Sequence, residues 1–513
     1  MKRMPLFLAP LFSGILLILS FPPFNLFLPP FVALVPLLYF LDNESSNRRA
    51  ALGALFCGLL FWGVLLYWIT LFTEAGYLLL ILVLALNQLL FALVIRRLKR
   101  SLGLPLALTA PPVWVALEYL HAHGDLAFTW GQLAYTLTGF PLWLQMASLT
   151  GPYGVGLWLA AINALIYELL KRGPGWRPRR NPALVLALLL AFPALFGGYR
   201  YRAYEKLKSR ADRLKVSYIQ PSIPQEIKWS PELRDSITAL LGELTLGQAE
   251  NHPRLVLWPE AAVPANLRFD QAPREYIGSI ARRLDCFILT GASEFRYNLE
   301  TKRYDAYNSA FFFGPEGDLE GSYDKLHLVP ISERMPYEQT FTRLRDIDVG
   351  GSHFIPGKKY VIFEMGEEKF SVLICFESIF PELSRSFVSQ GARFLANITN
   401  DAWFERSPAA SQHSSFLVLR AIEEGREIVR AANTGVSAFY DRLGRRRQAT
   451  ALFEPATATD TILTFSDRTF YNRYGDLAAH LAWILSLLLL VISFRGSKSK
   501  SKAGSDVEGA ERL

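Results

Sequence analysis

Long apolar runs alternate with short polar connections over the first 200 residues of the chain. A helix that spans a bilayer needs about 17–25 apolar residues. Runs of that length occupy residues 5–21, 24–41, 52–73, 76–96, 104–120, 151–170, 182–198 and 476–494. The first run follows Lys2 and Arg3 but has no small-x-small cleavage site after it, so we expect it to be retained. The pattern predicts a polytopic α-helical membrane protein with about eight spans.

Between residues 199 and 475 the pattern changes to short β-like runs separated by helix-like stretches. The β-like runs are 216–220, 255–258, 287–290, 309–313, 371–374, 394–397 and 436–440, and the helix-like stretches include 231–250, 273–284 and 411–432. Strands that alternate with helices predict an α/β layered domain of about 250 residues. The segment after Arg495 is polar and of low complexity, and we expect it to be disordered.

Positive charge lies mostly in short clusters beside the apolar runs. The net charge is +8, and the clusters fall at residues 2–3, 48–49, 96–100, 171–180 and 495–502, whereas the connections around 73–76 and 121–131 carry almost none. The basic stretch 200–215 runs against this trend. Because Lys and Arg are enriched in cytoplasmic loops, eight spans predict cytoplasmic termini and a periplasmic segment 199–475. The same distribution makes nucleic acid a poor explanation for the positive charge.

The cysteines and one carboxylate within the apolar runs stand out. Cys57, Cys286 and Cys375 are too few for a disulfide scaffold, and no Cys-x-x-Cys metal pattern is present. Cys57 lies inside an apolar run and Cys286 enters an apolar strand, so we expect Cys286 to be a buried structural thiol. Glu118 is costly at membrane depth. A functional carboxylate and an interfacial one that reaches water are both open interpretations.

Three polar motifs each stand where a predicted strand ends. In LVLWPEAAVP, the proline cannot continue a central ladder, so Glu260 lies at a carboxyl end, where α/β sheets often carry their chemistry. Lys325 lies in SYDKLHLVP, and Cys375 in SVLICFES follows a strand and precedes a predicted helix start. A helix N-terminus and a nearby Lys would lower the pKa of the thiol, and a carboxylate could accept its proton. Each residue alone could have an ordinary structural role, as a buried thiol, a solvated Glu or a surface Lys. Together they predict a nucleophilic site.

The series WPE, DKLHLVP and CFE resembles the Glu-Lys-Cys triad of the nitrilase superfamily. IPQEIKW, YNSA, NDAWF, SQH and RAANTGVSA, with the N-terminal runs and the returning C-terminal one, are similar to the apolipoprotein N-acyltransferase family over essentially the whole chain. The resemblance implies a membrane domain of seven helices over 1–198 and a nitrilase-like α-β-β-α sandwich over 199–475. A single membrane helix over 476–494 and a cytoplasmic tail over 495–513 would complete the chain.

Site residues are carried over position by position. The resemblance implies Glu260 as general base, Lys325 as the cation that stabilises an oxyanion, Cys375 as nucleophile and Glu333 as an assisting carboxylate. The other pocket residues that it implies are Trp229, Asn308, Phe376, Glu377, Asn400 and Trp403. Ser332 stands where the family more often has glycine, and Phe376 where tyrosine is also common. Neither departure touches the triad, so we expect altered pocket detail and retained activity.

The activity of the family supplies the expected partners. Its members move a fatty acyl chain from a phospholipid, typically phosphatidylethanolamine, through a thioester to the α-amino group of diacylglyceryl-cysteine in a lipoprotein. The resemblance therefore implies a phospholipid donor, diacylated apolipoproteins as acceptors, and a monomer in the inner membrane of a Gram-negative bacterium, with no metal or cofactor. Two other hypotheses stay open. A membrane-tethered nitrilase-type amidase is permitted by the triad but leaves seven spans unexplained. A transporter or binding protein with an inactive outer domain would be favoured by a lost triad member.

Overall fold

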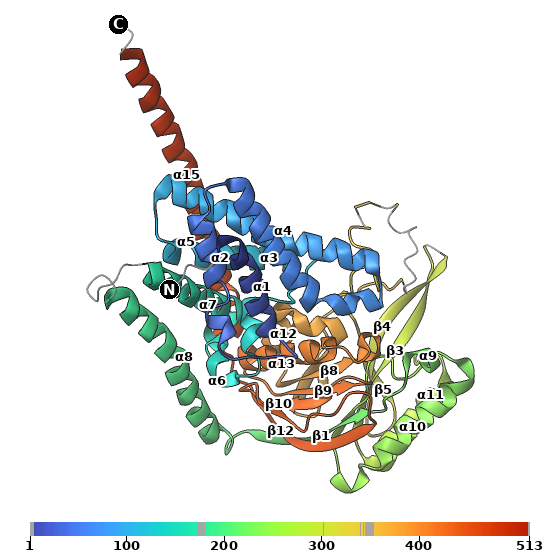
Figure 1. Ribbon diagram of the computed structural model, residues 1–513. Helices are drawn as coiled ribbons and strands as arrows, with labels where there is room; N and C mark the ends of the chain where they lie inside the picture. The colour runs from blue at the N-terminus through green and yellow to red at the C-terminus, as the bar shows by residue number, and fades with distance from the viewer. Residues whose placement is uncertain are drawn as a thin grey trace. The chain divides into compact units, whose positions relative to one another are not determined.

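The computed structural model describes residues 5–171, 180–300, 302–338, 340, 341, 343 and 353–510. It divides the chain into two compact units, Met1–Gly198 with Asp476–Leu513, and Tyr199–Gly475. The first unit is helical and the second is α/β (Figure 1). The division falls where the long apolar runs give way to the mixed segment.

Apolar helices dominate the first unit. They are α1 (Ala9–Leu19), α2 (Val35–Asn43), α3 (Asn47–Leu65), α4 (Glu74–Leu102), α5 (Leu106–Leu120), α6 (Pro141–Leu144), α7 (Ala147–Lys171), α8 (Arg180–Leu207), which runs on into the second unit, and α15 (Leu477–Ala510). Within the described residues, α3, α4, α7, α8 and the part of α15 up to Arg495 are long and apolar enough to cross a membrane, and 6–19 and α5 are shorter apolar helices. Exposed leucines on α4 and α8, such as Leu79 and Leu188, suit a lipid environment.

The count of eight spans is not confirmed. The predicted run 24–41 is not one helix, because a 3-10 turn at Pro29–Phe31 precedes the nine-residue α2. Its prolines explain the break, since proline lacks the N–H that a helix interior needs. At the other end of the chain, α15 continues to Ala510, where the sequence predicted a disordered tail from 495. The helix can continue past Arg495 because extending an existing helix requires no new nucleation.

Basic connections of the first unit meet at one end of its helices. Asp42, near the end of α2, pairs with Lys171 at the end of α7 (2.7 Å), and its backbone carbonyl accepts from Lys99 near the end of α4 (2.7 Å). Arg97 of α4 donates to the carbonyl of Ser493 in α15 (3.2 Å). Arg96 of α4 also donates to Asn47 at the start of α3 (2.8 Å), so the clusters around residues 48, 97, 171 and 495 lie on one side of the unit. The basic residues at 2, 3 and 172–179 lie outside the described residues.

Two six-stranded sheets form the second unit, with strand orders β12-β1-β2-β3-β4-β5 and β11-β10-β9-β8-β7-β6. The first contains β1 (Asp212–Gln220), β2 (Leu255–Leu257), β3 (Phe287–Asn298), β4 (Arg303–Phe313), β5 (Leu319–Asp324) and β12 (Ala456–Thr464), and the second contains β6 (Phe363–Met365), β7 (Glu368–Ile374), β8 (Phe394–Thr399), β9 (Ile428–Ala432), β10 (Ala438–Tyr440) and β11 (Arg446–Arg447). Strands β1–β2–β3 and β7–β8–β9 pair in parallel, so each sheet has a parallel centre whose carboxyl ends share an edge.

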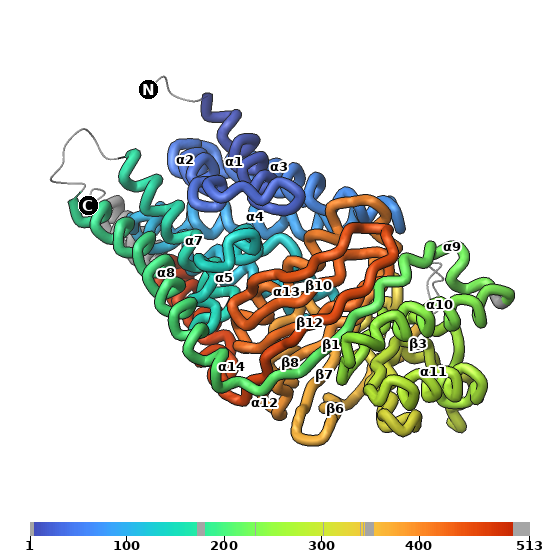
Figure 2. Tube along the Cα trace, turned by 90° about the horizontal axis from the view of Figure 1, so that it is seen from below, coloured from blue at the N-terminus to red at the C-terminus, as the bar shows by residue number. Residues whose placement is uncertain are grey.

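The sheets stack face to face between two layers of helices. The rings of Phe312 on β4 and Phe370 on β7 lie 5.4 Å apart, and those of Tyr218 on β1 and Phe439 on β10 lie 5.2 Å apart. The helices of this unit are α9 (Gln225–Lys228), α10 (Arg234–Leu246), α11 (Gln271–Leu284), α12 (Pro381–Ser389), α13 (Ala409–Glu424) and α14 (Phe470–Tyr474). Apolar residues of α10 and α11 pack on the first sheet, and α12 and α13 pack on the second (Figures 1 and 2). The α-β-β-α sandwich is the predicted architecture.

One predicted helix of this unit is too long. The stretch 411–432 is helical only up to Glu424, because Gly425 takes a left-handed conformation (φ 63°) that ends α13. Residues 428–432 form β9 at the centre of the second sheet, with every residue buried. The predicted helix 411–432 is therefore two elements, a helix and a strand, which the chain reversal at Gly425 separates.

Candidate active site

The three predicted triad residues all follow strand ends of the second unit. Glu260 comes three residues after β2, Lys325 directly follows β5, and Cys375 directly follows β7. Asn308 lies on β4, and Asn400 directly follows β8. Loops at one edge of each sheet therefore meet at a single site.

A carboxylate–ammonium–carboxylate cluster forms the polar part of the site. The Lys325 Nζ donates to Glu333 Oε1 (2.9 Å) and to Glu260 Oε1 (3.3 Å). The Asn308 amide donates to the same two oxygens, at 3.0 and 2.8 Å. Lys325 is 1% exposed and Glu260 is 6% exposed. The buried cation thus sits between two carboxylates whose orientation is fixed by one amide.

Two further groups hold Glu260. The backbone N–H of Asn400 donates to Glu260 Oε2 (2.8 Å), and the Lys228 Nζ donates to the Glu260 backbone carbonyl (3.2 Å). Lys228 is fully buried, and burial lowers its pKa to about 8. Sequence reasoning missed Lys228 as a site residue. The available signal was its place in IPQEIKW, directly before the predicted Trp229.

The electrostatics of the cluster keep both charges in place near neutral pH. Burial alone would raise the pKa of Glu260, but the Lys325 charge, with the Asn308 amide and the Asn400 N–H, holds it below its usual value. For Lys325, burial opposes the charge, yet Glu333 and Glu260 raise its pKa above the ordinary lysine value. The resting site therefore contains a carboxylate with a low affinity for protons beside a permanent cation.

Cys375 lies beside this cluster in a strained turn. It has φ 51°, in the left-handed region that non-glycine residues rarely adopt, and begins the 3-10 turn Cys375–Ile379. Burial raises the pKa of its thiol, the charge of Glu260 raises it further, and Lys325 lowers it only in part. The sequence predicted a lowered pKa. That prediction fails because burial outweighs one ammonium and a single short turn, so the resting thiol is protonated.

Glu377 is buried and joins two loops of the site. One of its oxygens accepts from the Tyr323 hydroxyl (2.7 Å) and from the Leu326 N–H (2.7 Å), and the other accepts from the Ile374 N–H (2.7 Å). Burial raises the pKa of Glu377 to about 7. Its bonds tie the loop that carries Lys325 to the turn that carries Cys375. Glu377, which the resemblance implies as a pocket residue, is thus a buried link between these two segments.

The remaining predicted residues lie at different depths. Phe376 is buried, with its ring 5.1 Å from that of Phe380. Trp229 and Trp403 are 48% and 53% exposed. Each is close in sequence to a group that holds Glu260, since Trp229 follows Lys228 and Trp403 comes three residues after Asn400. These two indoles offer half-exposed aromatic surface next to buried polar anchors.

Comparisons with known proteins cover both units. The family model for the apolipoprotein N-acyltransferase N-terminal domain matches residues 13–165, and the carbon-nitrogen hydrolase model matches residues 215–462. The apolipoprotein N-acyltransferase of Geobacter metallireducens is 33% identical over 95% of both chains. That of Chlorobaculum tepidum is 30% identical over 95% of this chain and 97% of its own. The chain belongs to the apolipoprotein N-acyltransferase family. Among solved structures, an amidase from Nesterenkonia sp. aligns with 53% of this chain at 17% identity and a TM-score of 0.38.

Family membership and the apolar helices make the chain a membrane protein. Its thiols fall into two classes. Cys57 and Cys286 are fully buried, whereas Cys375 is partly exposed. Cys286 belongs to the apolar core beneath the first sheet, and burial raises its pKa to about 12. Of the three cysteines, Cys375 is therefore the one whose residue is not fully buried.

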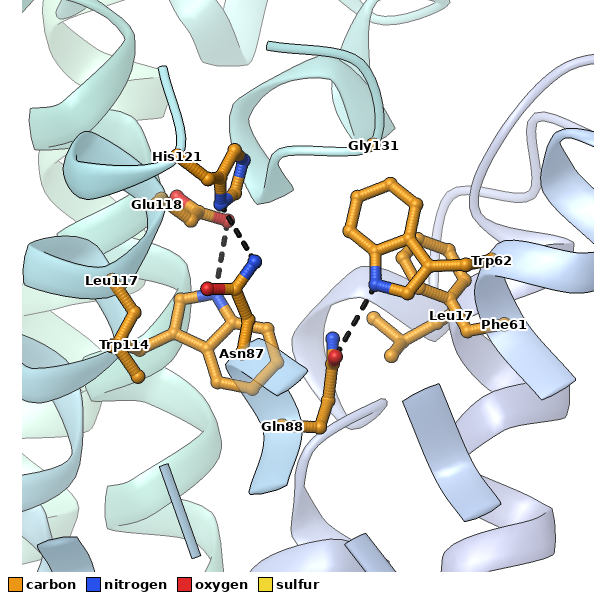
Figure 3. Close-up of a pocket in the computed structure, with 10 residues that line it drawn as sticks. All are labelled: Leu17, Phe61, Trp62, Asn87, Gln88, Trp114, Leu117, Glu118, His121 and Gly131. Carbon is orange, nitrogen blue, oxygen red and sulfur yellow. Dashed lines mark hydrogen bonds between the residues drawn. The ribbon is translucent and has the colours of Figure 1, made fainter. Parts of the chain in front are cut away.

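Glu118 lies within the region that matches the N-terminal family model. It is 6% exposed and accepts from the Trp114 indole and from the Leu133 backbone N–H, both at 2.9 Å. Figure 3 shows it beside His121 and Asn87, whose amide is 2.9 Å from the His121 Nδ1. The carboxylate does not extend toward water from the helix end. It holds the segment after α5 against that helix.

Proposed function

We propose that the chain transfers a fatty acyl group from a phospholipid to the α-amino group of diacylglyceryl-cysteine at the N-terminus of a lipoprotein. Family membership over both units supports the proposal. The observation that carries it is the grouping of the Glu260 carboxylate, the Lys325 ammonium and the Cys375 thiol in a membrane protein.

In the first half-reaction, Cys375 is the nucleophile and Glu260 the general base. The thiol proton passes to Glu260 as sulfur attacks the acyl ester carbonyl. Lys325 and backbone N–H groups beside Cys375 stabilise the oxyanion that forms, an effect of roughly 3–4 kcal/mol for each good donor. The ester C–O bond then breaks, and Glu260 returns the proton to the departing lysophospholipid hydroxyl. Because the pKa of Glu260 is lowered and that of Cys375 is raised, we expect proton transfer to accompany attack.

In the second half-reaction, the α-amine of the acceptor attacks the thioester. Glu260 takes a proton from the attacking nitrogen, the C–S bond breaks, and the proton returns to sulfur. Glu333 assists by sharing Lys325 and Asn308 with Glu260. The resting thiol and carboxylate are thereby restored, and the amide product carries the acyl chain.

A membrane location suits both substrates. Extracting a lipid from the bilayer costs about 0.8 kcal/mol per CH₂ that leaves it. An enzyme whose apolar helices hold it in the same membrane avoids that cost, which a soluble amidase acting on a small substrate would not face.

The proposal predicts an acyl-enzyme. After incubation with phosphatidylethanolamine and no acceptor, the intact mass of the protein should rise by one fatty acyl group, because the thioester has no amine to react with. Hydroxylamine should remove the added mass, since it cleaves thioesters. A protein whose mass stays unchanged while it releases free fatty acid or hydrolyses small amides would instead be a membrane-tethered hydrolase.

We also propose that the protein is a monomer of the inner membrane, with residues 199–475 in the periplasm and both termini in the cytoplasm. The gathering of basic residues at one end of the helices supports this orientation. A reporter that fluoresces only in the cytoplasm should therefore be bright when it is fused after Arg495 and dark when it is fused after Arg210. The reverse pattern would contradict the orientation.

A further inference from the structure

A buried polar network lies behind the turn that carries the nucleophile. His413 of α13 places its Nε2 3.1 Å from the carbonyl oxygen of Cys375 and 3.1 Å from the Ser378 hydroxyl. Its Nδ1 lies 3.0 Å from a carboxylate oxygen of Asp401. Asp401 in turn accepts from Arg430 of β9 (2.7 Å). His413 is 1% exposed, and Asp401 and Arg430 are equally buried.

This network fixes one backbone oxygen. A carbonyl can only accept hydrogen bonds, so the His413 Nε2–H donates to Cys375, and the Ser378 hydroxyl donates to the same oxygen (2.9 Å). With Nε2 protonated, Nδ1 on the opposite side of the ring accepts from Arg430 (3.2 Å), which Asp401 holds, and this prevents the ring from turning away. The His413 and Phe404 rings are also nearly perpendicular, with centroids 5.8 Å apart. Two donors therefore hold the carbonyl in a turn whose backbone is strained at Cys375.

The direction of that carbonyl decides where the next N–H points. A peptide unit is planar and trans, so its C=O and N–H groups point in opposite directions. With the Cys375 oxygen held toward the buried His413, the Phe376 N–H points away from the network. We propose that His413 is a positioning residue: it orients this N–H toward the oxyanion that forms when Cys375 attacks an acyl carbonyl. The proposal rests on acyl transfer at Cys375 as the proposed function.

Two substitutions at one position separate the hydrogen bond from the bulk of the ring. In His413→Gln, the amide nitrogen can reach the place of Nε2 and still donate to Cys375. In His413→Asn, the shorter side chain reaches only the place of Nδ1, so that donor is lost. His252→Asn is the matched control, because His252 is exposed and has a left-handed backbone (φ 47°) that Asn tolerates.

The assay compares two reactions of the same thiol in the full-length, detergent-solubilised protein. Acylation by a p-nitrophenyl ester passes through a tetrahedral oxyanion, whereas alkylation by iodoacetamide does not. We expect His413→Asn to slow acylation about 10- to 100-fold, the range for a displaced donor. Alkylation should stay within about twofold of wild type, since it requires no oxyanion donor. His413→Gln should recover most of the acylation rate, and His252→Asn should match wild type.

The proposal is overturned if His413→Asn acylates at the wild-type rate, if acylation and alkylation fall together, or if His413→Gln is as slow as His413→Asn. Thermal unfolding shows whether each variant folds. Should His413→Asn not fold, Ser378→Ala removes the other donor to the same carbonyl and should slow acylation selectively by a smaller factor. The ester assay does not depend on the natural donor. A wild type that accepts the ester but not phosphatidylethanolamine would therefore refute the proposed function and leave this inference standing.

Discussion

Cys375→Ser is expected to abolish the hydroxylamine-sensitive acyl-enzyme. A serine hydroxyl is much less acidic than a thiol, and the only general base proposed at the site, Glu260, has a lowered pKa. The substitution changes one atom, so the turn at φ 51° is retained. The measurement is single-turnover labelling with a radioactive-acyl phospholipid, followed by a chase with a diacylated lipopeptide. Wild type should acquire label and pass it to the peptide, and Cys375→Ser should do neither.

Cys286→Ala provides the thiol control for this experiment. Cys286 is buried in the apolar core beneath the first sheet, so its loss should lower stability and leave labelling intact. Persistent hydroxylamine-sensitive label on Cys375→Ser would mean that another residue carries the acyl group. Loss of label from folded Cys286→Ala would mean that the second thiol takes part in the reaction.

The positions of Glu260 and Cys375 could be predicted because each follows the end of an apolar strand, whereas Lys325 follows the polar strand β5, which was not among the predicted strands. Strand ends are visible in a sequence as a change from apolar to polar residues, and parallel strands bring their carboxyl ends to one edge. The parallel pairs β1–β2–β3 and β7–β8–β9 meet this condition for the signals at Glu260 and Cys375, whereas Lys325 follows β5, which pairs antiparallel with β4. The α/β class of the unit followed from the same alternation.

What the sequence could not supply depends on contacts between distant residues. Lys228 and Glu260 are 32 residues apart, and His413 and Cys375 are 38 apart, and nothing local to either member indicates the other. The hydrogen bonds that Glu377 accepts likewise join residues on three different segments. The direction of the pKa shift of Cys375 depends on how deeply the turn is buried. The sequence motif around Cys375, taken alone, predicted a lowered pKa.

Glu260→Gln is expected to slow acyl-enzyme formation by about 10²–10⁴-fold, the usual contribution of a general base. The amide cannot take the thiol proton, and its NH₂ group must face a donor, because both carboxylate oxygens now accept from N–H groups. The same substitution should make the Cys375 thiol easier to deprotonate. The negative charge of Glu260 raises the pKa of Cys375, so removing that charge lowers it. The pH at which iodoacetamide alkylation of Cys375 reaches half its maximum rate should therefore fall.

Glu333→Gln is the matched variant for this prediction. Glu333 also accepts from Lys325 and Asn308 through one oxygen and from a backbone N–H, that of Val329, through the other (2.8 Å). The substitution removes the same charge from beside Lys325, but the charges with the largest effects on the pKa of Cys375 are those of Glu260, Lys325 and Asp401. We therefore expect a smaller loss of acylation and a smaller downward shift of the alkylation profile. If the two variants lost equal activity with identical profiles, the carboxylates would act together as counter-ions of Lys325, and Glu260 would not be the base.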